Sequence, residues 1–170
     1  MLAQAPSSTH SVTLLLWAPT LAASAHIFEE FVWPGGFLDW HRGYRPQHAA
    51  SITPRFALIA NALLLFLCIA APVNGPTPLG VAEWLVATAI LATNAVFHVR
   101  AVLQTRAYSP GVVTAVFLYV PLTLGGTFWL IHTGLASIAT AAALFLAGGA
   151  YPFLSVFLHR RRSRARILIR

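Results

Sequence analysis

The stretch that decides the fold runs from Val12 to Trp33 and reads VTLLLWAPTLAASAHIFEEFVW. It is largely apolar, and a helix needs about 20 such residues to cross the hydrocarbon core of a bilayer. Its second half nevertheless contains His26, Glu29 and Glu30. Carboxylates inside hydrocarbon are costly, so they mark a functional site by default. The stretch therefore predicts a permanent membrane helix with a functional site near its end.

Four further segments of the chain have the same apolar character and length. Of the 170 residues, 58% are hydrophobic and only 9% are charged, whereas a soluble domain carries about 25% charged residues. We therefore predict an all-α polytopic membrane protein with a five-helix bundle within residues 1–158 and a basic cytoplasmic tail at residues 159–170. The four further spans are predicted at Phe56–Val73, Ala82–Leu103, Val112–Ile131 and Leu135–Leu158.

The basic residues indicate an orientation. All eleven are arginines, and they lie between the first two spans, at the end of the third, and after the fifth. Positive loops stay in the cytoplasm, so we expect the N-terminus outside and the C-terminus inside, in a multi-pass protein of the cell inner (plasma) membrane. The tail is expected to contact anionic headgroups of the lipid bilayer. No nucleic-acid partner is indicated, because the arginines lie in loops and a tail rather than on a soluble face.

Polar side chains lie at matching depth below this basic side. At the rise of a helix, Glu30 is ~5 Å deep, His98 ~8 Å and His26 ~10 Å, while Asn94 lies ~14 Å deep. Spacing of three or four residues puts the first-span groups on one helix face and Asn94 with His98 on another. Because lipid exposure would be expensive, both faces should point into the bundle. The other three spans place Asn61, Tyr119 and Tyr151 at similar depth.

Two kinds of chemistry suit these groups. His26, Glu29 and His98 could form a three-ligand metal site with an open position, as in catalytic zinc or non-haem iron sites. Glu30 would then act as a base or support the ligands. A metal-free site is equally consistent, in which Glu29 or Glu30 exchanges a proton with water or substrate beside His98. The candidate catalytic residues are Glu29, Glu30, Asn94 and His98.

Three functions stay open at this point. The first is an enzyme that acts on a lipid or other apolar substrate, with or without a divalent metal (zinc or iron). The second is a proton-coupled or metal-ion transporter, which would need a polar route to both faces of the membrane. The third is a structural polar network that only holds helices together. The outer halves of the spans are almost purely apolar, which favours a site open to one side.

The order of these motifs resembles a family of small bacterial integral membrane proteins named for its HxxEE motif. The resemblance covers about residues 20–125 and implies a membrane protein, but it supplies no reaction. It rests on His26-Ile-Phe-Glu29-Glu30, Trp40, Asn94-x-x-x-His98, Tyr108-Ser-Pro110-Gly111 and Pro121. A thinner similarity links the chain to CAAX-type intramembrane proteases, which pair a Glu-Glu motif with later His and Asn residues. The chain departs from them because it has no FxxxH motif, no Arg at the expected spacing after Glu30, and only five spans.

The link from Pro34 to Pro54 is the longest between spans. It mixes aromatic residues with arginines, which suits the membrane interface. A link of this length in a small protein is more often functional than idle. The sequence leaves open whether it forms a lid with Asp39 and His41 over the polar site.

Overall fold

The computed structural model describes residues 6–167, and within that range every regular element is helical. Five helical spans are long and apolar enough to cross a membrane. This confirms the predicted helical class, and the spans fall where the apolar segments predict them. They cover His10–Phe31, Pro54–Asn74, Pro78–Thr105, Val112–His132 and Ile138–Leu158.

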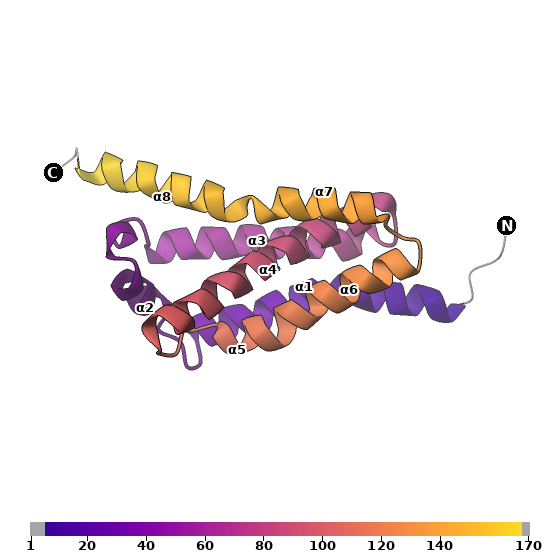
Figure 1. Cartoon of the computed structure of the whole chain (residues 1–170), viewed down its shortest axis with the longest axis horizontal. Helices are drawn as coiled ribbons and strands as arrows, with labels where there is room; N and C mark the ends of the chain where they lie inside the picture. Colours follow the sequence, from indigo (N-terminus) through magenta and orange to yellow (C-terminus); the bar gives the residue numbers. More distant parts are fainter. Residues whose placement is uncertain (1–5, 168–170) are drawn as a thin grey trace.

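The first three spans are continuous helices (Figure 1): α1 (Pro6–Phe31), α3 (Pro54–Asn74) and α4 (Pro78–Thr105). Helices α3 and α4 begin with the same capping arrangement. A threonine side chain accepts a hydrogen bond from the third backbone N–H that follows, and proline occupies the first helical position. This pairing satisfies a free N–H and uses the fixed φ of proline, so both helix starts are encoded locally.

The fourth span changes its helical repeat near its start. It consists of α5 (Val112–Thr114), the π-helical turn η2 (Ala115–Tyr119) and α6 (Val120–His132). Pro121 lies two residues after the end of the turn. It has no N–H and would press its ring against the carbonyl of Phe117, four residues earlier and within the turn. A wider turn relieves that contact, and such turns occur often at functional sites.

The fifth span is divided into α7 (Ile138–Gly149) and α8 (Tyr151–Ile167). The division falls at Ala150, two residues before Pro152, where a helix loses a backbone hydrogen bond. Helix α8 continues past residue 158, where the sequence predicts the bundle to end. The C-terminus and α2 lie at one end of the bundle, and the N-terminus lies at the other (Figure 1).

The link between the first two spans is itself partly helical. It contains α2 (Phe37–Tyr44) and the short 3-10 helix η1 (Pro46–His48). The sequence predicts this segment only as a link with interface aromatics. Helix α2 packs against α1, so the aromatic residues of the link lie against the end of the bundle.

Helix α4 is central and packs against α1, α3, α6 and α7. The glycine pairs Gly125-Gly126 and Gly148-Gly149 predict close helix approach, and the structure places one glycine of each pair, Gly126 and Gly148, at a tight contact. A Cβ on Gly126 would overlap the ring of Trp84, and one on Gly148 would lie 2.6 Å from the Val86 carbonyl oxygen. Their neighbours Gly125 and Gly149 face open space.

An interior proline also positions α4. Pro19 of α1 has no N–H to offer the carbonyl of Leu15, four residues earlier. Trp84 Nε1 of α4 donates to that carbonyl at 2.8 Å. The freed backbone group of one helix is thus satisfied by a neighbouring helix, as interior prolines in membrane helices require.

Candidate functional site

The structure brings the predicted polar residues of the first and third spans together. His26, Glu29, Glu30 and His98 all have at most 6% of their surface exposed. Asn94 Nδ2 lies 3.1 Å from His26 Nε2, so the second predicted face also joins the cluster. Helices α1 and α4 are in direct contact, and the cluster lies between them.

Glu30 lies at the centre of this cluster. Its Oε1 is 3.4 Å from His26 Nε2 and 3.3 Å from His98 Nε2. The three ligand atoms all lie within 4.8 Å of one another, and all three residues are buried. Two imidazoles and one carboxylate therefore meet at one point within the bundle.

Glu29 takes a different direction from the one predicted. It accepts hydrogen bonds from the Tyr108 hydroxyl at 2.6 Å and from the backbone N–H groups of Val113 at 3.1 Å and Thr114 at 2.7 Å. The Thr114 hydroxyl donates to the same carboxylate. Glu29 thus caps the start of the fourth span, where free N–H groups favour a negative charge.

The predicted metal set of His26, Glu29 and His98 therefore changes by one member. The structure gathers His26, Glu30 and His98 instead. Neighbouring helical residues point about 100° apart, so either carboxylate could have faced the histidines. The fourth span decides the outcome, because its N–H groups bind Glu29 and leave Glu30 beside the rings.

Hydrogen bonds fix the tautomer of His26. Its Nδ1 lies 2.8 Å from Thr114 Oγ1, whose only hydrogen is donated to Glu29 or to the Gly111 carbonyl. His26 Nδ1 must then be the donor in that contact. In a neutral ring Nε2 is then the acceptor, which agrees with the amide of Asn94 donating to it.

His98 is held in a similar way. Its Nδ1 lies 2.9 Å from Ser109 Oγ, and both residues are completely buried. Its Nε2 has no hydrogen-bond partner among residues 6–167 and faces Glu30. Both rings thus use Nδ1 to contact a hydroxyl of the 109–114 segment and turn Nε2 toward the same carboxylate oxygen.

Gly111 allows the 109–114 segment to approach this closely. Its φ is +99°, in the left-handed region that favours glycine. A Cβ there would lie 2.6 Å from His26 Cε1 and 3.0 Å from Glu30 Cγ. Only a glycine at this position lets the backbone lie directly against the cluster.

Aromatic rings cover the cluster. The rings of Trp40 and His98 are stacked with centroids 6.2 Å apart, and Phe97 lies edge-on to His98 at 5.1 Å. Tyr119, from the π-helical turn, lies 4.7 Å from the ring of His26. Arg45 sits over Phe97 at 4.9 Å. Helix α2 thus brings an aromatic cover to the cluster, and water has little access to it.

Not every residue at the predicted depth joins the site. Asn61 is only partly buried, and Tyr151 is 41% exposed on α8. Asp39 pairs with Arg42 at 2.8 Å on the exposed face of α2 rather than turning inward. The polar layer therefore rests on α1, α4 and the start of the fourth span.

The sequence alone predicts no site role for the residues that orient the cluster: Tyr108, Ser109, Gly111 and Thr114. The first three stand out there only as part of the motif on which the family resemblance rests. Three of them lie in the Tyr-Ser-Pro-Gly sequence that precedes the fourth span. A turn sequence rich in hydroxyls beside a membrane helix is a signal that could have identified them. Tyr108 lies outside the spans, and burial together with its bond to Glu29 raises its pKa to about 12, so its hydroxyl remains a donor at neutral pH.

Comparison with known proteins agrees with the resemblance of the motifs. Residues 17–125 match the family described as proteins of unknown function with an HXXEE motif. The chain belongs to this HXXEE family. The matched range includes the whole polar cluster, from His26 to Tyr119. No curated protein and no solved structure matches the chain.

Proposed function

We propose that this HXXEE protein is a membrane-embedded, metal-dependent enzyme that acts on a lipid or other apolar substrate. One observation carries the proposal: His26, Glu30 and His98 direct two ring nitrogens and one carboxylate oxygen to one buried point. Two histidines and one carboxylate with further positions open are a common set in catalytic zinc and non-haem iron sites.

Two of the three ligand-to-ligand distances fit such an ion, and all three atoms lie within 4.8 Å of one another. Two ligands that each lie about 2.0 Å from a tetrahedral zinc are about 3.3 Å apart. Glu30 Oε1 lies 3.3 Å from His98 Nε2 and 3.4 Å from His26 Nε2. In the tautomer fixed for His26, its Nε2 offers a lone pair, as metal binding requires.

The surrounding hydrogen bonds also fit a metal site. Histidines that bind metals almost always donate their other ring N–H to a neighbouring group. Here Thr114 contacts Nδ1 of His26 and Ser109 contacts Nδ1 of His98. Glu29 takes part indirectly, because it holds Thr114 in place.

A divalent ion at this point would polarise a substrate carbonyl or activate a water molecule. The remaining chemistry belongs to the chain. Asn94 donates to Nε2 of His26. An ion would take that lone pair, and the freed amide of Asn94 would then be placed to contact a substrate bound beside the ion. Trp40 and Phe97 exclude bulk water and offer an apolar surface next to His98.

The opposite half of the bundle favours an enzyme over a transporter. A transporter needs polar groups along a route to the second face. Fully buried Leu16, Trp84 and Leu130 instead form one apolar core there. Glu83 lies near that face, but its carboxylate is bound by Asn74 Nδ2 at 2.8 and 3.0 Å.

The direct test is the metal content of the protein purified in detergent without chelators. We expect close to one zinc or iron per chain, and at least a tenfold loss in Glu30→Gln and in His98→Ala. Glu83→Gln is the matched control, since it changes a partly buried, hydrogen-bonded carboxylate at the other end of α4. Thermal unfolding recorded on the same samples separates loss of the ion from loss of the fold.

Two results would remove the proposal. One is a protein that binds no divalent ion even after incubation with zinc or ferrous iron. The other is unchanged metal content in folded Glu30→Gln. If both variants lose stability together and no metal is ever found, the cluster serves only to hold α1 and α4 together.

The orientation is part of the proposal. Helix α2, the end of α4 and the end of α8 lie at one end of the bundle (Figure 1), and each of these segments of the sequence carries arginine. Positive ends face the cytoplasm. We infer an outer N-terminus and a cytoplasmic C-terminus, which places the cluster near the cytoplasmic leaflet. A reporter fused after Arg170 should be active only in the cytoplasm. Activity outside would mean that the orientation is the opposite of the one inferred.

A further inference from the structure

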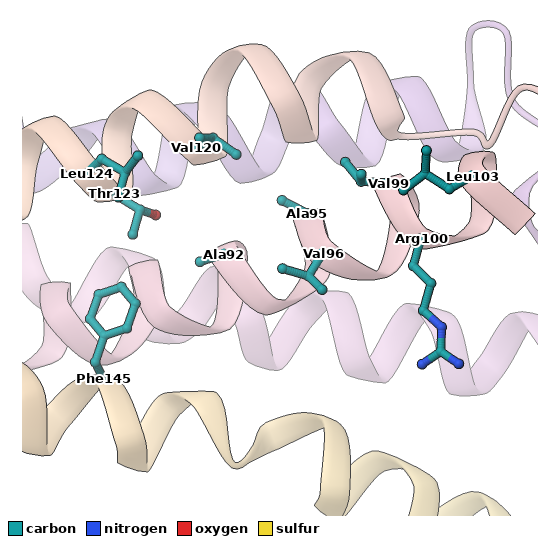
Figure 2. Close-up of a pocket in the computed structure, with 10 residues that line it drawn as sticks. All are labelled: Ala92, Ala95, Val96, Val99, Arg100, Leu103, Val120, Thr123, Leu124 and Phe145. Atoms are coloured by element: carbon teal, nitrogen blue, oxygen red, sulfur yellow. The ribbon is translucent and has the colours of Figure 1, made fainter.

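A cavity lies on the far side of α4 from the polar cluster. Figure 2 shows it as a groove bordered by α4, α6 and α7, with Phe145 at one end and Arg100 at the other. Its volume is about 400 Å³, within the range of small-molecule sites. Apart from Arg100 and Thr123, its lining is apolar, as shown by Val96, Leu103 and Leu124.

The groove is separate from the candidate metal site. Val96, Arg100 and Leu103 are spaced by four and three residues, so they form one stripe on α4. Asn94 and His98 form the other stripe, which faces α1. Thr123 uses its hydroxyl to bind the Thr88 carbonyl within the bundle, so it adds no free polar group to the groove.

Arg100 has no acidic side chain as a partner among residues 6–167. The sequence contains four acidic side chains. Glu29 and Glu30 belong to the polar cluster, and Asp39 pairs with Arg42. Glu83 lies on α4 itself, 17 residues before Arg100, which is about 25 Å along the helix. The exposed guanidinium of Arg100 is therefore free to pair with an anion from outside the protein.

The dimensions of the groove match one leaflet of a bilayer. From Ala92 to Leu103 the lining of α4 rises about 16 Å. Half of the hydrocarbon core measures about 15 Å. Arg100 lies near the end of α4, at the end of the bundle that carries α2 (Figure 1). Its guanidinium is thus at headgroup depth when the apolar part of the groove is at acyl-chain depth.

We propose that this groove binds one acyl chain of an anionic phospholipid, whose phosphate pairs with Arg100. A guanidinium can donate two parallel hydrogen bonds to a phosphate. Val96, Val99 and Phe145 line the part of the groove that holds the acyl chain. A lipid with a net negative headgroup is preferred over phosphatidylcholine, because the choline cation compensates the phosphate charge. The site is independent of the proposed metal-dependent activity.

The test measures lipid binding by native mass spectrometry of the delipidated full-length protein in detergent. Phosphatidylglycerol and phosphatidylcholine with the same acyl chains are the two probes. We expect about a fivefold preference for phosphatidylglycerol, since one arginine near a membrane surface contributes ~1 kcal/mol. Arg100→Gln should remove the preference, and Arg100→Lys should keep most of it. Arg106→Gln is the matched control, because Arg106 lies at the same end of α4 outside the groove.

A second pair of variants tests the apolar part. Val96→Trp fills the groove and should lower binding of both lipids at least threefold. Leu146→Trp adds the same ring to an exposed position of α7 outside the groove and should change neither. Unchanged selectivity in Arg100→Gln, or unchanged binding in Val96→Trp, would overturn the proposal. So would a dimer that Val96→Trp converts to a monomer with no change in lipid binding, because the groove would then hold a helix of a second copy.

Discussion

The two ends of the bundle are filled by different kinds of side chain. At the end where the N-terminus lies, Leu16, Trp84 and Leu130 are fully buried in an apolar core. At the other end, His26 and Glu30 occupy the corresponding place between α1 and α4. Lipid gives no hydrophobic drive between helices, so close packing and hydrogen bonds hold membrane bundles together. The first end uses mainly packing, whereas the second uses a hydrogen-bonded network.

The difference teaches where function is located. An apolar core would hold the second end together at lower cost, because buried charged groups must all find partners. The network keeps two histidines and a carboxylate that packing alone does not require. Within it, Glu29 accepts four hydrogen bonds, whereas Glu30 faces only the two rings. We interpret Glu29 as the structural carboxylate and Glu30 as the functional one.

The largest expected effect comes from Glu29→Ala. The change leaves the backbone N–H groups of Val113 and Thr114 without their acceptor, and the partly exposed Tyr108 hydroxyl loses its bond to Glu29. Each unsatisfied buried group costs about 1–3 kcal/mol, so we expect a loss of unfolding free energy on the order of 3 kcal/mol or more. The measurement is reversible unfolding in mixed micelles. Glu30→Gln, which keeps its shape, should lose less stability but more metal. A loss below 1 kcal/mol in Glu29→Ala would erase the distinction between the two carboxylates.

The next effect compares glycines of the two ends. In Gly111→Ala the new Cβ overlaps His26 and the left-handed backbone is strained, so we expect the free energy of unfolding to fall by about 1–3 kcal/mol. Gly126→Ala meets Trp84 at the apolar end and should cost a similar amount. Only Gly111→Ala should also lower metal content, because only it displaces a proposed ligand. Gly125→Ala, which meets open space, is the control and should be neutral or slightly stabilising. Equal metal content in all three variants would show that Gly111 does not position a metal ligand.

A smaller effect is expected for Trp84→Phe. The ring is mostly kept, but the Leu15 carbonyl freed by Pro19 loses its donor. We expect a loss of about 1–2 kcal/mol in unfolding free energy. Metal content should stay at the wild-type level, as measured by elemental analysis. A fall in metal content would show that the two ends of the bundle are coupled rather than independent.

The smallest effect is expected for Tyr108→Phe. The hydroxyl bonds Glu29 but is partly exposed, so its loss should cost about 1 kcal/mol. Folding raises the pKa of Tyr108 from 10 to about 12. The stabilisation is therefore complete below pH 10 and disappears as the pH rises toward 12. The difference in unfolding free energy between wild type and variant, measured from pH 8 upward, should shrink in that range. A constant difference would contradict the assigned bond.

Much of the fold could be read from the sequence. The five apolar segments predict the spans because segment length is set by bilayer thickness. Prolines and threonines mark the starts of α3 and α4 because capping is a local interaction. The paired glycines of the fourth and fifth spans also predict close helix approach, because a residue without a side chain leaves room for a neighbouring helix. The sequence also identified the polar residues of α1 and α4, since helical spacing determines which side chains share a face.

The tertiary structure decided which of those residues face one another. Helical spacing leaves Glu29 and Glu30 on the same broad face, and only the N–H groups of the fourth span separate their roles. The π-helical turn and the aromatic cover of α2 likewise depend on neighbours distant in sequence. The rotation of each helix about its axis is set by contacts with other helices. For that physical reason the sequence by itself determined the spans and the polar layer, and the assembled bundle determined which polar side chains face one another.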